Sequence, residues 1–145
     1  MFIVKTKSTS LFMEINMTTK REHILSLMNE QINFTAEMEG DCISISNDEG
    51  LDAFLVVGEQ QIVVETILFP TDAVKDCGVL DHEILRTHRL VPLSTIAVST
   101  ISSQEYYVAF GALSTDSKDE VIVEEVEALF ANVPEFLELY SEHLK

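Results

Sequence analysis

The sequence predicts one α+β domain, in which an antiparallel sheet packs against helices in the order α-ββββ-α-ββ-α. Three observations support this prediction: segments of alternating apolar and polar residues occur in two runs, the turns inside each run are short, and segments with helical spacing flank and separate the runs. The chain has 145 residues, 46% of them hydrophobic, which is enough for one substantial core.

Residues 1–17 precede the first clear helix start. We therefore expect residues 18–145 to form the domain and residues 1–17 to be an N-terminal extension. Apolar residues at positions 2–4 and 11–13 would also suit an edge strand. The sequence leaves both arrangements open.

The first helix is predicted over residues 20–31. Thr19 followed by Glu22 has the spacing of a capping box, in which the two side chains satisfy free amide groups at a helix start. Ile24 and Leu27 then begin an apolar stripe with helical spacing.

From residue 33 onward the apolar period changes to two, which is typical of strands. The turns at Gly40, Gly50 and Gly58 are short, so the strands should pair as an antiparallel meander. The four predicted strands cover residues 34–39, 42–46, 52–57 and 62–69.

A second helix is predicted over residues 82–90, with Asp81 as its N-cap and Pro92 beyond its end. A hairpin should follow. Its two strands are expected over residues 95–101 and 105–113.

The last helix is expected to begin with a second capping box, formed by Ser117 and Glu120. Its apolar stripe continues past Pro134 as far as Leu144. Because the stripe is not interrupted, we predict one helix with a kink at the proline rather than two helices.

The chain is strongly acidic, with 9 Lys and Arg against 25 Asp and Glu and a net charge of −16 at pH 7. Such a charge repels phosphate backbones and anionic lipids, so we expect neither nucleic-acid binding nor direct membrane insertion. It favours solubility and association with a basic partner. The carboxylates are too evenly scattered to favour an acidic mimic of DNA.

Cys42 and Cys77 have no metal-binding spacing, and a chain of this size needs no disulfide framework, so both thiols should be reduced. The apolar runs are too short for a membrane helix, and no secretory leader is recognisable. The expected location is the cytoplasm.

A search for catalytic motifs finds no glycine-rich phosphate loop, no zinc-protease motif and no serine-hydrolase motif. We therefore expect no catalytic residues, no metal site and no cofactor. Asp41, Asp48, Glu49 and Asp52 lack the spacing of a calcium loop and are better explained as a solvated turn. A nucleophilic Cys77 with His82 or His88 as its base would need a third orienting group, which the sequence does not indicate.

The segment 85–89 is the one basic island in this acidic chain. Arg86 and Arg89 are one helical turn apart and would bind a carboxylate or phosphate, with His88 and Glu65 as further candidate binding residues. The alternative is structural pairing of the arginines with Glu83 or Glu65.

Tyr107 is a further candidate, as an aromatic residue in a strand that would anchor a partner. Tyr106 faces the other way, so one ring should belong to the core and the other should be partly exposed. A core position is the simpler interpretation of Tyr107.

Three segments carry a family resemblance: residues 64–70, 85–94 and 106–114. Through them the chain resembles the YjfI-like family of bacterial proteins over residues 17–144. The resemblance implies no catalytic residues. It does imply a context, since relatives are encoded beside a homologue of the membrane-stress protein PspA.

The order of elements and the acidity also resemble the type III secretion chaperone-like fold, with one more strand than is usual there. Proteins of that fold are small, acidic and often dimeric, and they bind extended segments of other proteins without catalysis.

The function expected from these observations is that of a non-enzymatic, chaperone-like or adaptor module that binds another protein and forms a homodimer. Its partner would be basic or PspA-like. The alternative is a small-ligand or anion binder, or an enzyme, that uses Arg86, His88 and Arg89.

Overall fold

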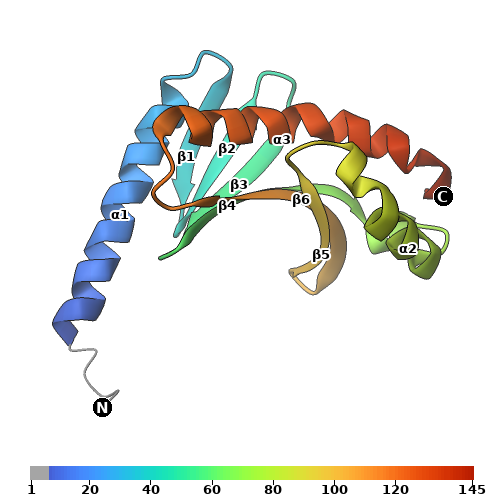
Figure 1. Cartoon of the computed structure of the whole chain (residues 1–145), viewed down its shortest axis with the longest axis horizontal. Helices are drawn as coiled ribbons and strands as arrows, with labels where there is room; N and C mark the ends of the chain where they lie inside the picture. Colours follow the sequence, from blue (N-terminus) through green and yellow to red (C-terminus); the bar gives the residue numbers. More distant parts are fainter. Residues whose placement is uncertain (1–6) are drawn as a thin grey trace.

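The computed structural model describes residues 7–145, which form three α-helices and six strands (Figure 1). The elements are α1 (Lys7–Asn29), β1 (Phe34–Glu39), β2 (Cys42–Asn47), β3 (Asp52–Val57), β4 (Gln61–Pro70), α2 (Cys77–Thr87), β5 (Thr95–Ile101), β6 (Gln104–Ser114) and α3 (Asp119–Leu139). Three short 3-10 turns complete them: η1 (Thr71–Ala73), η2 (His88–Leu90) and η3 (Ser141–His143). The predicted α+β class and element order are confirmed.

The six strands form a single sheet in the order β1-β2-β3-β4-β6-β5, and every neighbouring pair is antiparallel. The first four strands are the predicted meander. β6 pairs with β4, with a register shift between Ile67 and Phe69, and β5 then forms the far edge. This arrangement leaves β1 and β5 as edge strands.

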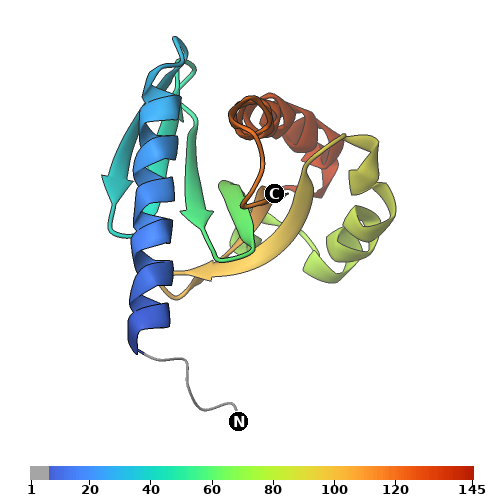
Figure 2. The same cartoon turned by 60° about the vertical axis from the view of Figure 1, so that its left-hand side comes forward.

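One face of the sheet packs against the helices and holds the core. Ile24 of α1, Leu80 of α2 and Phe136 of α3 are buried in the same cluster as Ile62 and Val64 of β4. α3 crosses the sheet, while α1 and α2 lie toward its two ends (Figures 1 and 2). The alternate residues of β4 project from the opposite face.

The predicted start of the first helix is wrong. α1 begins at Lys7, and Thr19 lies inside it, with its hydroxyl donating to the carbonyl of Ile15 at 3.0 Å. A threonine can satisfy its hydroxyl in this way within a helix, so it need not act as a cap. The helix passes through the predicted boundary between residues 17 and 18. The domain division stays a prediction, and residues 1–6 lie outside the described part.

The predicted start of the second helix is also wrong. α2 begins at Cys77, and its N-cap is Asp76, whose carboxylate accepts a hydrogen bond from the amide of Val79 at 3.2 Å. Asp81 is an interior residue of α2. In the sequence it looks like a cap because it is an acid shortly before the apolar pair Ile84 and Leu85.

The second predicted capping box is likewise absent. The N-cap of α3 is Lys118, which makes no side-chain capping bond, and Ser117 lies before it. α3 does continue through Pro134 as one helix, as predicted, but it ends at Leu139. The last residue of the predicted stripe, Leu144, instead forms an antiparallel bridge with Val74.

Candidate functional site

Tyr107 of β6 faces the core and is only 1% exposed. Its ring packs against Phe69 with 5.1 Å between centroids, and its hydroxyl donates to the Asp81 carboxylate at 2.6 Å. Burial, followed by the hydrogen bond to Asp81, raises the pKa of the Tyr107 phenol far above its usual value. The phenol therefore stays protonated and joins β6 to α2.

Replacing Tyr107 by Phe should lower the free energy of unfolding by about 1–2 kcal/mol, because one hydrogen bond to a charged acceptor is lost while the ring stays packed. Urea denaturation measures this change. Asp81→Asn keeps an acceptor in place and should cost less. Equal stability of wild type and Tyr107→Phe would show that the bond contributes nothing.

The structure does not bring the other predicted site residues together around Tyr107. Glu65 pairs in register with Phe110, on the sheet face opposite Tyr107. Arg86 and Arg89 are exposed, and within residues 11–145 neither forms an ion pair, so the predicted pairing with Glu83 or Glu65 is not observed.

His88 lies in η2 and is partly buried. Its Nδ1 is buried without a hydrogen-bond partner among the described residues. The Cys77 thiol donates to the carbonyl of Thr71 at 3.6 Å, and no hydrogen bond in residues 11–145 links it to His82 or His88. The Cys–His pair considered from the sequence is therefore not assembled. Cys42 and Cys77 form no disulfide with each other.

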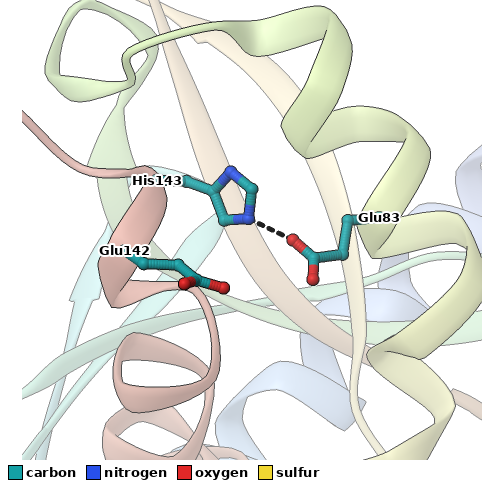
Figure 3. A group of neighbouring side chains, drawn as sticks. All are labelled: Glu83, Glu142 and His143. Atoms are coloured by element: carbon teal, nitrogen blue, oxygen red, sulfur yellow. Dashed lines mark ion pairs between the residues drawn. The ribbon is translucent and has the colours of Figure 1, made fainter.

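Arg86 lines a hollow of about 460 Å³ between α2 and the C-terminal turn. In this hollow Glu83 forms an ion pair with His143, and the carboxylate of Glu142 lies beside them (Figure 3). Sequence reasoning missed this cluster, because Glu83 is far from the other two residues along the chain. The remaining lining residues are Val79, His82 and Thr87.

A second hollow, of about 370 Å³, lies beside the first half of α1, and we call it the α1 groove. Met13 and Met17 provide apolar surface together with Val57, and Glu59 and Asp116 are acidic residues of the lining. The other lining residues are Asn16, Lys20, Gly58 and Thr115. Both methionines lie within residues 1–17, for which the sequence leaves an extension and an edge strand open, so the groove was not expected.

The outer side of the same half of α1 is also apolar. Leu11, Phe12 and Ile15 are each more than half exposed. The first turns of α1 extend beyond the sheet in both views (Figures 1 and 2). No helix of the described residues is long and apolar enough to cross a membrane.

A third hollow, of about 190 Å³, lies between α2 and the edge strand β5, and we call its surroundings the α2–β5 surface. Leu85 and Val98 stand at this hollow and are 78% and 46% exposed. The other lining residues are Asp81, Ile84, Ile96, Ala97 and Tyr107. An apolar hollow next to an unpaired strand edge is suited to binding another protein chain.

Solved structures with a similar fold include the following three. A chain of the structure titled "Structure of the HopA1-SchA Chaperone-Effector Complex" matches with a TM-score of 0.60 and 11% identity, covering 82% of this chain and 94% of that one. A chain of the "Crystal Structure of the ExsC-ExsE Complex" matches with a TM-score of 0.58 and 14% identity, covering 88% and 95%. The third is YbjN, described as a putative transcription regulator from E. coli, with a TM-score of 0.59, 12% identity and coverage of 88% and 93%. The predicted resemblance to the type III secretion chaperone-like fold is confirmed.

Proteins related by sequence are more similar to this chain, at 29% identity, than these solved structures are. The uncharacterized protein YjfI of Escherichia coli (strain K12) is 29% identical over 120 residues, which are 82% of this chain and 90% of that protein. YjfI of Escherichia coli O157:H7 matches with the same figures. The family model described as "Uncharacterized protein conserved in bacteria (DUF2170)" matches residues 9–144, so the match begins earlier than the predicted resemblance at residue 17. The chain belongs to the DUF2170 family.

Proposed function

We propose that this chain is a non-enzymatic protein-binding module of the adaptor or chaperone-like kind, which holds a short segment of a partner protein in the α1 groove. The observation that carries this proposal is the first half of α1, which places Met13 and Met17 in the groove and exposes further apolar residues on its outer side. A folded monomer rarely leaves so much apolar surface in one place unless something covers it.

The chemistry of the groove suggests what kind of segment binds. Methionine side chains are flexible and polarizable, so Met13 and Met17 adapt to apolar residues of different shapes. Glu59 and Asp116 outnumber Lys20 in the lining, and on a chain with a net charge of −16 they attract lysine and arginine. The partner segment therefore carries apolar residues flanked by basic ones. A PspA-like protein is the candidate that the YjfI-like resemblance favours.

The comparisons support this proposal through the fold. One of the similar structures is, by its title, a chaperone–effector complex, and a second is also a complex. The alternative, an anion binder built on Arg86, has less support, because the carboxylates of Glu83 and Glu142 share the hollow and would repel an anion.

We also propose that the module is a homodimer, joined through the α2–β5 surface. Two copies of a strongly acidic chain repel each other, so they should meet where the repulsion is weakest. The α2–β5 surface offers that place, because exposed Leu85 and Val98 are next to the segment that carries Arg86 and Arg89.

The groove is tested by a double variant, Met13→Glu with Met17→Glu, which places two more carboxylates in it. A partner captured from bacterial cells by the wild type is identified, purified and titrated against each variant. We expect the double variant to bind at least about tenfold more weakly, because apolar contact is lost and the new charges must be desolvated.

The matched control is Ile32→Glu, which adds a carboxylate at a fully exposed isoleucine between α1 and β1. The control should bind like the wild type. Binding of the natural partner should also weaken as salt is raised, because charge attraction is screened. Equal affinity of the double variant and the wild type would rule out the α1 groove as the binding site.

A further inference from the structure

Three potential metal ligands meet where the C-terminal turn lies against α2. Glu83 comes from α2, while Glu142 and His143 come from η3, and all three side chains point into the space between these elements (Figure 3). One ligand atom from each residue lies within 4.8 Å of the other two. Within residues 11–145, these three are the His, Cys, Asp or Glu side chains that lie close enough together to hold a metal ion.

Two of these ligand atoms are buried and lie against each other. Glu83 Oε2 and His143 Nε2 form an ion pair and have no further hydrogen-bond partner among the described residues. A metal ion bound by both atoms would take the place of the proton that the pair shares, because metal ligands must be deprotonated.

The backbone holds both sides of the cluster in place. The carbonyl of His143 accepts from the amide of Lys75 at 2.9 Å, and the carbonyl of Glu142 accepts from Lys75 Nζ at 3.0 Å. On the other side, the Thr87 hydroxyl donates to the carbonyl of Glu83 at 2.7 Å and is bonded to Tyr140 Oη at 2.9 Å. The main chain that carries the three ligands is therefore held in place before an ion binds.

We propose that Glu83, Glu142 and His143 bind a divalent transition-metal ion, of which Zn²⁺ is the best fit. Zn²⁺ accepts imidazole nitrogen together with carboxylate oxygen, whereas Mg²⁺ and Ca²⁺ prefer oxygen alone. This proposal revises the absence of a metal site that was expected from the sequence.

The ligands must move to take up an ion. Ligand bonds to zinc are about 2 Å long, so tetrahedral ligand atoms lie roughly 3.4 Å apart. Glu83 and His143, which touch in their ion pair, must separate, and the exposed Glu142 must rotate toward them. Arg86 lines the same hollow, but the two carboxylates outweigh its single charge. With the ion bound, the C-terminal turn is tied to α2.

Zinc binding is measured by titration calorimetry on full-length protein that has been dialysed against a chelator. Binding should raise the melting temperature, because the ion binds the folded chain in preference to the unfolded one. Glu142→Gln is the decisive variant, since an exposed side chain can be changed without disturbing the fold. We expect it to weaken zinc binding by about tenfold or more, as loss of a ligand does.

Two controls separate a built site from general attraction to an acidic surface. Glu138→Gln removes an exposed carboxylate on α3 outside the cluster, and His82→Asn removes an imidazole that lines the same hollow. Both should bind zinc like the wild type, and Co²⁺ should give a visible spectrum that Glu142→Gln alters. No binding by the wild type, or equal loss in Glu142→Gln and Glu138→Gln, would leave only an ion pair between Glu83 and His143.

Discussion

Replacing both Leu85 and Val98 by Asp is expected to convert the proposed homodimer into a monomer. The two side chains stand at the hollow between α2 and β5, where a second copy would bury them. A carboxylate buried at an interface without a partner costs several kcal/mol, and two of them should abolish association. Light scattering after size-exclusion chromatography measures the mass of each variant at the same concentration.

Ile32→Asp is the matched control, because it makes the same kind of change at a fully exposed apolar residue away from this surface. The Ile32→Asp variant should have the same mass in solution as the wild type. Raising salt should strengthen the dimer, since two chains of charge −16 repel each other less when screened. A monomeric wild type, or a double variant that keeps the dimer mass, would contradict the proposed interface.

The sheet was predictable because its signals are local. Alternation of apolar and polar residues marks each strand, and the tight turns between strands fix which neighbours pair first. At Gly40 and Gly50 the backbone φ is positive, at +61° and +84°, which glycine adopts without strain. All six observed strands therefore lie within a residue or two of their predicted bounds.

The helix starts were not predictable, because one sequence pattern serves two purposes. A threonine three residues before a glutamate can cap a helix, or it can sit inside one and bond to the preceding turn, as Thr19 does. Asp76, the real N-cap of α2, follows a charged loop and precedes a cysteine and a glycine, which gives a weak helical signal. Where each helix begins depends on how its residues pack against the rest of the domain, and the local sequence pattern carries no information on that packing.

The candidate site depends on contacts that are distant in the sequence. Glu83 meets His143 because the bridge between Val74 and Leu144 brings the C-terminus beside α2. Tyr107 and Glu65 lie on opposite faces because of the register between β4 and β6. Neither the bridge nor the register has a local signal, so residue type alone grouped Glu65 with Arg86 and His88 and left Glu142 out.

Replacing Phe136 by Ala is expected to lower the free energy of unfolding by about 3–5 kcal/mol, the cost of leaving a large cavity in a packed core. Phe136 is completely buried, and its ring stacks on Tyr140 with 6.4 Å between centroids. Urea denaturation followed by circular dichroism measures the change. Phe12→Ala is the matched control, because Phe12 is 63% exposed and should contribute less than about 0.5 kcal/mol.

The effect should extend beyond the cavity because of Pro134, which lies two residues before Phe136 in α3. A proline has no amide hydrogen to donate, so the helix loses a backbone bond there and its last turns depend on side-chain packing. Phe136 and Tyr140 provide that packing, and Tyr140 also holds Thr87 of α2. Loss of Phe136 should therefore loosen η3 and the proposed zinc cluster as well. A cost as small as that of Phe12→Ala would show that the end of α3 is held by other contacts.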